Sequence, residues 1–277
     1  MPETLLDQEI IDAVDRLSPV SSIIRKLLAV LADPYSDIDD ISKLIRVDTA
    51  LSAQVLRLAN SAYFAPQGGV ASIEEAIQQT GVNEIMRLAM AINAKQLSAR
   101  PLNHYRISSN LLWHHALGVA VAAELLAERF LLDVSAAYLS GLLHTMGIVV
   151  LDTAAASRGI PPLPVGTPLL AWEGRNFGSD NTAISSRVLN AWNFPENITN
   201  AVATRYTAPT PDSIGQLGGV LYLACALAER IPAGLPPETG LFKISAPLLE
   251  SLRLSREDWS DLELASGQKF SRLKALF

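Results

Sequence analysis

Apolar residues recur at intervals of three and four along almost the whole chain, and only short segments alternate with period two. Spacing of this kind places the apolar side chains on one face of a helix, so the pattern predicts an all-α fold. Five compact helices fit residues 5–81, the first with an apolar stripe at Ile10, Ile11 and Val14. Further helices are predicted at about 83–97, 111–129, 134–144, 181–190, 198–205, 214–230 and 255–276.

Polar residues mark where several of these helices begin and end. Ser, Thr and Asp side chains accept hydrogen bonds from the free N–H groups of a first helical turn, and an acid three residues later completes a capping box. The predicted starts are Ser18-Pro19, Ser36 with Asp39, Ser72 with Glu75, Asp133, and Ser255 with Asp258. One helix is predicted to end near Asp33-Pro34, and the proline-rich segment 159–168 is predicted to be a loop.

Composition and charge limit the classes of partner and the cellular compartment that we expect. The 277 residues carry a net charge of −6, and no stretch gathers the lysine and arginine that a phosphate backbone attracts, so we expect no nucleic-acid partner. Residues 40–62 resemble a helix-turn-helix, but one cation, Arg57, among leucines favours packing. Because Cys225 is the single cysteine, an intramolecular disulfide is excluded. We expect its side chain to be a small buried apolar group. Because the first residues do not form a secretory signal, we expect a cytoplasmic protein.

One segment is long and apolar enough to raise the question of a membrane span. Val134 to Leu151 runs 18 residues without an Asp, Glu, Lys or Arg. It nevertheless contains two serines, two glycines, a histidine and a threonine. These residues favour a buried helix of a globular core over a lipid-facing one, so no membrane association is expected.

Two segments together resemble a known family. The first runs from Arg46 to Phe64 and is followed by Ser72-Ile-Glu-Glu-Ala-Ile77 and Gly81, and the second combines Trp113-His-His115-Ala with Ala137 to Gly147. This arrangement resembles the HDOD domain, a bacterial signalling relative of the HD phosphohydrolases and of the HD-GYP cyclic-di-GMP phosphodiesterases. The resemblance spans roughly residues 15–230. Its motif positions are Asp48, Leu51, Asn60, Ser61, Trp113, Gly141 and Gly147.

The resemblance implies an HD-type helical bundle preceded by a helical subdomain. The corresponding division is an N-terminal subdomain at 1–100, an HD-like core at 101–230 and a C-terminal helical extension at 231–277. The implied role is that of a regulatory module which binds a protein partner, such as a signalling enzyme or another regulator. The resemblance does not identify that partner.

The metal site of an HD hydrolase can be traced onto this chain through the resemblance. Such enzymes use histidines and an adjacent His-Asp pair to hold metal ions that activate water against a phosphoester. Here the pair is His144-Thr145, Asn181 stands where active members place a histidine, and Arg205-Tyr206 stands where relatives often have two histidines. A threonine hydroxyl is a weak neutral ligand and a guanidinium has no lone pair to offer. Only His115 and His144 remain as plausible ligands, so we expect no bound metal, no cofactor and no catalysis.

Two other functions stay open. A residual metal-dependent phosphohydrolase would combine His115 and His144 with Asp152 or Asp180. A nucleotide sensor without catalysis would use Arg187 or Arg205 for anion contacts.

The motif residues also have plain structural interpretations. Asn60-Ser61 would close a helix, Trp113, Trp172 and Trp192 would pack in the core, and His144 would be a buried histidine bonded to a backbone carbonyl.

Overall fold

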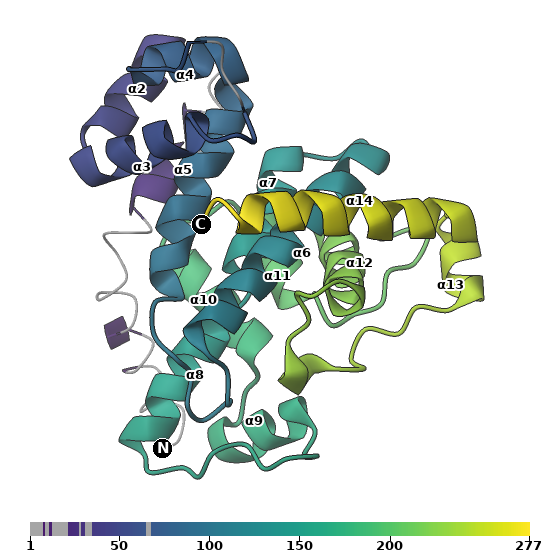
Figure 1. The fold of residues 1–277 in the computed structure, drawn as a ribbon. Helices are drawn as coiled ribbons and strands as arrows, with labels where there is room; N and C mark the ends of the chain where they lie inside the picture. Colours follow the sequence, from purple (N-terminus) through teal and green to yellow (C-terminus); the bar gives the residue numbers. More distant parts are fainter. Residues whose placement is uncertain (1–7, 9–10, 13–21, 28, 31–34, 65–67) are drawn as a thin grey trace. The chain divides into compact units, whose positions relative to one another are not determined.

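The computed structural model describes residues 8, 11–12, 22–27, 29–30, 35–64 and 68–277 (Figure 1). The regular elements of the described residues are all helices, and their one β-type pairing is an isolated antiparallel bridge between Leu102 and Ile107. The all-α prediction is therefore confirmed. The chain divides into two compact units: a small unit of residues 17–97 and 272–277, and a large unit of residues 1–16 and 98–271.

The small unit contains α2 (Ile38–Arg46), α3 (Thr49–Ala59), α4 (Ile73–Thr80) and α5 (Val82–Leu97), and its described residues 22–27 and 29–30 are also helical. Asp48 caps α3 by accepting hydrogen bonds from the backbone of residues 50 and 51, and Leu51 lies in the core. Asn60 ends α3, and its side chain pairs with both the N–H and the C=O of Val70. The family motif in this unit therefore includes helix ends and the closure of the loop after α3.

One predicted cap is wrong by one residue. The capping box of α2 is formed by Asp37 and Asp40, not by Ser36 and Asp39, because the helix begins at Ile38 and its third residue is Asp40. Ser72 caps α4 as predicted, although the Glu75 carboxylate reaches back to the N–H of Ala71. The predictions at Ile10, Val14, Ser18-Pro19 and Asp33-Pro34 lie outside the described residues.

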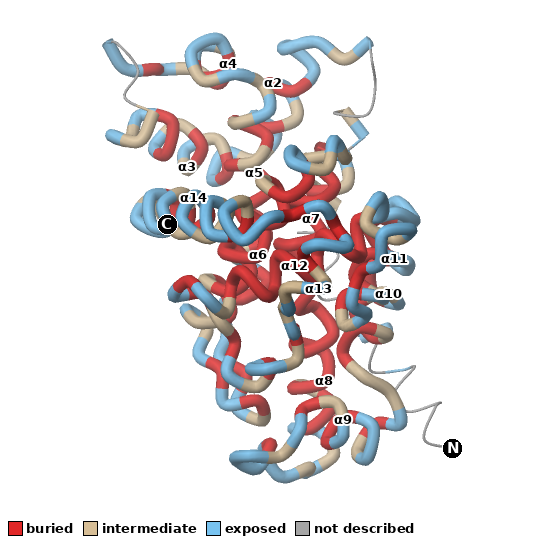
Figure 2. Tube along the Cα trace, turned by 90° about the vertical axis from the view of Figure 1, so that its right-hand side faces the viewer, coloured by how far each residue is buried: buried red, intermediate tan, exposed pale blue. Residues whose placement is uncertain are grey.

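The large unit is built around a core of three helices. Its elements are α6 (Ser109–Arg129), α7 (Val134–Leu143), α8 (Met146–Ser157), α9 (Leu169–Phe177), α10 (Asn181–Ala191), α11 (Glu196–Ala203), α12 (Leu217–Arg230), η1 (Pro236–Glu238), α13 (Ala246–Ser251) and most of α14 (Arg256–Lys274). α6, α7 and α12 are buried along most of their length (Figure 2). α6 and α7 approach closely at Gly141, where an added Cβ would lie 2.6 Å from the backbone nitrogen of Ala120. The three tryptophans predicted to pack, Trp113, Trp172 and Trp192, are all buried.

The apolar segment that begins at Val134 is not one helix. α7 ends at Leu143, its C-cap is His144, and α8 starts again at Met146. The helix predicted at 134–144 corresponds to α7, whereas α8 was not predicted as a separate helix. Both helices are apolar on nearly all sides, so periodicity gives a weak signal there. Ser185 on α10 fixes the turn, since its hydroxyl accepts from the Gly147 N–H at 2.6 Å and donates to the His144 carbonyl at 2.9 Å.

The segments on either side of α12 differ from the sequence-based expectation. α8, α9 and α13 were not predicted, α11 ends at Ala203 rather than 205, and 158–168 is a loop as expected. Residues 231–271 belong to the same compact unit as 98–230. Ser255 and Asp258 form the predicted reciprocal cap at the start of α14.

Two helical stretches, Ser109–Arg129 and Val134–Ser157, are long and apolar enough to cross a membrane by length and composition alone. Inside the structure 78% and 89% of their most apolar windows are buried. Core helices of a soluble protein have this property, so the two stretches are weak evidence for a span.

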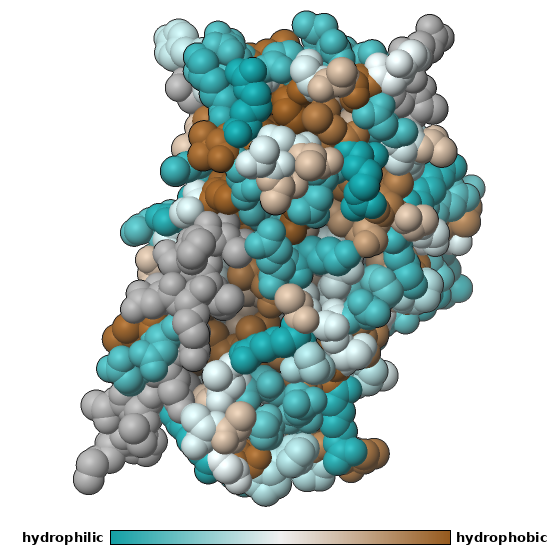
Figure 3. Space-filling view, turned by 60° about the vertical axis from the view of Figure 1, so that its left-hand side comes forward, coloured by the Kyte–Doolittle hydropathy of each residue, from teal (hydrophilic) through white to brown (hydrophobic). Residues whose placement is uncertain are grey.

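The face drawn in Figure 3 is largely hydrophilic, with apolar groups interspersed. Among the described residues, the large apolar side chains that remain exposed include Tyr35, Val47, Leu131 and Val165. They are distributed over both units.

Candidate functional site

Four polar side chains from distant parts of the chain meet inside the large unit. His115 comes from α6, His144 from the end of α7, Arg205 from the turn after α11, and Glu238 from η1. All four are at most 1% exposed. One donor atom each of His115, His144 and Glu238 lies within 4.8 Å of the other two. We call these four residues the central cluster.

The two histidines of the central cluster are held by backbone carbonyls. His144 Nδ1 lies 2.7 Å from the Gly141 carbonyl oxygen, and His115 Nδ1 lies 2.8 Å from that of Ala233. Because a carbonyl can only accept, each Nδ1 carries the hydrogen, and the two Nε2 atoms face each other at 3.0 Å. This is the buried, carbonyl-bonded environment that the sequence indicated for His144.

Arg205 and Glu238 form a fully buried ion pair. Arg205 Nη2 lies 2.6 Å from Glu238 Oε1, and His115 Nε2 lies 3.6 Å from Glu238 Oε2. Burial alone would lower the pKa of Arg205 and raise the pKa of Glu238. The opposite charge of the partner outweighs burial in both cases. The pKa of Arg205 is therefore raised, and the pKa of Glu238 is held well below its usual value. Burial, and secondly the Arg205 charge, lower the pKa of His144 well below its usual value.

A chain of buried hydrogen bonds extends from Arg205 toward α9. Arg205 Nη2 donates to Asn181 Oδ1 at 2.6 Å and to the Tyr206 hydroxyl at 2.7 Å, and that hydroxyl donates to Glu238 at 2.7 Å. The guanidinium also lies 4.1 Å from the centre of the Tyr206 ring. Asn181 extends this series of hydrogen bonds to α9, because its Nδ2 donates to Glu173 at 2.9 Å.

Glu173 is the far end of this chain and gives it a pH dependence. Burial raises the pKa of Glu173 to about 7, although the backbone and side-chain amides of Asn181 and the Tyr105 hydroxyl donate to it and act in the opposite direction. A carboxyl whose pKa is higher in the folded than in the unfolded state stabilises the fold fully below about pH 4.5, and loses this contribution as the pH rises through about 7.

We therefore expect a Glu173→Gln variant to gain stability relative to the wild type as the pH rises. From pH 5 to pH 8 the difference in their free energies of unfolding should change by about 2–3 kcal/mol in favour of the variant. Urea titrations of both proteins at several pH values measure this shift. Parallel profiles of the two proteins would show that Glu173 is already ionised in the fold.

With Arg205 in place, the central cluster does not fit a divalent metal ion. Thr145, next to His144, is buried and neutral, and its hydroxyl has no hydrogen-bond partner among the described residues. Glu238 is the single carboxylate of the cluster, and its Oε1 already binds the Arg205 charge. A divalent ion added beside the guanidinium would leave three positive charges against one carboxylate in a buried site, where unpaired charge is strongly unfavourable.

The other residues proposed as ligands or anion contacts do not join the cluster. Asp152 accepts from the backbone N–H of His104 at 2.7 Å, and Asp180 is the N-cap of α10. Of the two arginines predicted as alternative anion contacts, Arg187 is exposed and Arg205 is buried in the central cluster. The structure therefore removes Asp152 and Asp180 from the hydrolase alternative.

Three important residues were missed from the sequence: Glu238, Glu173 and Tyr105. Glu238 lies in the segment beyond residue 230, where the family motifs end, and follows Pro236-Pro237 in a short 3-10 turn. A sequence signal existed only for Glu173, which is a lone acid among the apolar residues of α9. Buried acids need partners, so an acid at that position indicates a polar network.

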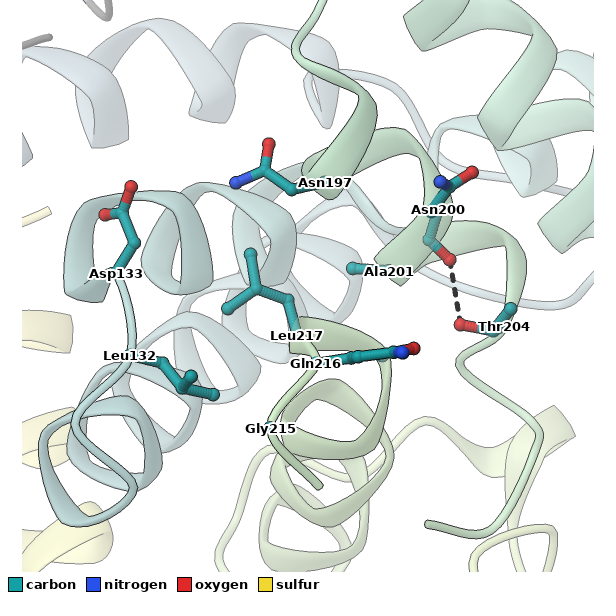
Figure 4. A pocket seen from close by; sticks show the side chains of 10 residues that line it. Leu132, Asp133, Asn197, Asn200, Ala201, Thr204, Gly215, Gln216 and Leu217 are labelled. Atoms are coloured by element: carbon teal, nitrogen blue, oxygen red, sulfur yellow. Dashed lines mark hydrogen bonds between the residues drawn. The ribbon is translucent and has the colours of Figure 1, made fainter. Parts of the chain in front are cut away.

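The large unit also has an open polar groove of about 560 Å³ (Figure 4). It lies between the start of α7, the α11 helix and the start of α12, and its polar side chains are Asp133, Asn197, Asn200, Thr204 and Gln216. None of its lining residues is a lysine or an arginine. An anion such as a phosphate group therefore finds no cationic side chain in the groove.

Comparisons with known proteins place the chain in a family. A sequence profile of the HDOD domain matches residues 17–208. An uncharacterized protein of Treponema pallidum (strain Nichols) is 27% identical over an alignment of 273 residues, and the match covers 92% of this chain and 49% of that protein. The chain therefore spans about half the length of that curated relative.

Solved structures share the fold. An HDOD domain protein with unknown function from Geobacter sulfurreducens is 21% identical with a TM-score of 0.70, and the match covers 98% of this chain and 99% of that one. A protein from Shewanella amazonensis SB2B named "Putative phosphohydrolase" is 21% identical with a TM-score of 0.63, and the match covers 95% and 97%. At these identities the likeness concerns the fold alone.

Proposed function

Because this chain belongs to the HDOD domain family, we propose that it is a non-catalytic regulatory module of the bacterial cytoplasm, which acts by binding a protein partner. One observation carries the non-catalytic part of the proposal. Arg205 is buried in the central cluster and bonded to its single carboxylate, Glu238. Hydrolysis of a phosphoester by an HD-type site needs metal ions to activate water, and the fixed guanidinium charge opposes them.

Residual metal-dependent phosphohydrolysis is the second candidate, and one observation favours it. His115, His144 and Glu238 bring three ligand atoms within 4.8 Å of one another, which is one donor more than the sequence indicated. Three protein ligands with an open fourth position are typical of catalytic zinc. The Arg205 charge favours the non-catalytic candidate, because a metal ion bound to Glu238 would have to displace the Arg205 guanidinium from that carboxylate.

A nucleotide sensor has less support. Arg205 is fully buried and its Nη2 already binds Asn181, Tyr206 and Glu238. The open groove has no cationic side chain. Recognition of a phosphate usually needs such a side chain or a phosphate-binding loop.

A hydrolysis assay tests the non-catalytic part. The full chain is dialysed against Zn²⁺, Mn²⁺, Fe²⁺ or Mg²⁺ and assayed with bis(p-nitrophenyl) phosphate and with a cyclic dinucleotide, beside a His144→Ala variant. We expect both proteins to give only the rate of the metal blank. Metal-stimulated hydrolysis by the wild type that His144→Ala abolishes would favour the phosphohydrolase instead.

Partner binding needs a separate experiment. The tagged full chain is captured from cells that express it naturally, and each recovered protein is purified and titrated against the chain. We expect at least one protein to bind reversibly, and to bind a His144→Gln variant with the same Kd, because His144 is completely buried. Failure of every recovered protein to bind in the purified system would contradict a role in protein recognition.

A further inference from the structure

The two histidines of the central cluster present an arrangement that suits a positive centre. Both Nδ1–H groups donate to backbone carbonyls, and both Nε2 lone pairs face the gap of 3.0 Å between the rings. Two lone pairs at this distance repel each other, and a cation between them would remove the repulsion. Metal-binding histidines are oriented in the same way, with the second nitrogen donating to a carbonyl.

Glu238 adds a carboxylate on the same side. Its Oε2 atom lies 3.6 Å from His115 Nε2 and has no hydrogen-bond partner among the described residues. Ligands at about 2.0–2.2 Å from a tetrahedral Zn²⁺ lie about 3.3 Å apart from one another. Two spacings of the cluster, 3.0 Å between the Nε2 atoms and 3.6 Å from His115 Nε2 to Glu238 Oε2, are close to this value. Two histidines with one glutamate are a ligand set that zinc accepts.

Arg205 supplies what a metal ion would otherwise supply. Its guanidinium neutralises Glu238 from 2.6 Å, and it carries the permanent charge of the cluster. Its Nε and Nη1 atoms have no hydrogen-bond partner among the described residues, so the side chain serves the site mainly through Nη2. The geometry thus favours zinc, whereas the charge excludes it.

We propose that Arg205 is a built-in substitute for a divalent metal ion, and that His115, His144 and Glu238 form a latent zinc site which opens when Arg205 is replaced by a neutral side chain. This inference rests on the proposed function in one respect: both require that the central cluster of the wild type holds no metal. The wild-type module then keeps its fold whatever the supply of metal, because its cation belongs to the chain.

The test compares zinc binding by the full-length wild type, Arg205→Met and Arg205→Lys. Methionine keeps a long apolar stem without the charge, and lysine keeps the charge, so Arg205→Lys is the matched control. Each protein is dialysed against Zn²⁺, and its zinc content is measured by elemental analysis. We expect about one zinc per chain for Arg205→Met and none for the other two, with a zinc affinity at least about 100-fold above the wild type because a unit charge no longer repels the ion.

Two further variants keep the result interpretable if Arg205→Met does not fold or if zinc binds elsewhere. If Arg205→Met does not fold even with zinc, Arg205→Gln replaces it, since its amide can still donate to Glu238 and Asn181. The double variant Arg205→Met/His144→Ala lacks a ligand and should lose the zinc and the zinc-dependent rise in Tm. Zinc retained by the double variant would place the ion elsewhere and overturn the inference.

The outcomes separate the two proposals. A folded neutral variant that binds no more zinc than the wild type overturns the latent site and leaves the proposed function intact. Stoichiometric zinc in the wild type overturns the substitution by Arg205 and removes the main support for a non-catalytic module.

Discussion

Replacing Arg205 by methionine should lower the free energy of unfolding by about 3–5 kcal/mol when measured with a metal chelator present. The substitution leaves the Glu238 carboxylate buried, 1% exposed, without its cation, and it also removes the donor to Asn181 and Tyr206. Breaking one side of a buried ion pair has this large effect because the remaining charge stays out of water. Urea unfolding followed by circular dichroism measures the change.

A double-mutant cycle shows whether the effect comes from the pair. Arg205→Met combined with Glu238→Gln removes both charges, so the double variant should be less destabilised than the sum of the single variants, with a coupling of about 2–3 kcal/mol. Arg187→Met is the matched control on an exposed arginine of α10, and it should change stability by less than about 1 kcal/mol. Additive single effects would contradict a direct Arg205–Glu238 interaction.

Replacing Gly147 by alanine should destabilise the protein by about 3 kcal/mol or more. A Cβ at this position would overlap the carbonyl oxygen of Asn181 and lie 2.8 Å from the backbone nitrogen of Ser185. Both contacts are with the backbone of α10, so no side chain can rotate to make room, and α8 must separate from α10. The separation would also break the bonds by which Ser185 holds the His144 turn.

Gly174→Ala is the matched control for this glycine. Gly174 lies in the exposed part of α9, and a Cβ added there would meet nothing within 4 Å. Alanine should therefore stabilise the protein by about 0.5–1 kcal/mol through its higher helix propensity. Thermal unfolding of both variants measures the contrast, and a loss of stability for Gly147→Ala no larger than about 1 kcal/mol would contradict the close packing of α8 on α10.

The sequence predicted the fold class and part of the site, and the limits of the prediction have physical reasons. Periodicity detects amphipathic helices, which is why the helices around Ile41, Leu51 and Ile184 were found. The helix at 134–144 was predicted to end at His144, but α7 and α8 are apolar on nearly every side, so periodicity did not predict α8 as a separate helix. The turn between them is set by Ser185, which lies about 40 residues further along the chain.

The central cluster shows the same limit more clearly. His115, His144 and Arg205 could be selected because the resemblance gives each a motif position, whereas Glu238 has none and reaches the cluster only through the folding of η1. The sequence counted two neutral imidazoles and predicted that too few ligands remain. The structure adds Glu238 as a third donor and shows that its carboxylate is already bound to Arg205.

The central claim is that a guanidinium, and not a metal ion, neutralises Glu238. A crystal structure of the wild-type chain soaked in Zn²⁺, with anomalous data collected at the zinc edge, measures this directly. We predict no anomalous peak between His115, His144 and Glu238, and Arg205 Nη2 within hydrogen-bond distance of Glu238. A zinc peak bound by those three side chains, with Arg205 turned away, would contradict the account.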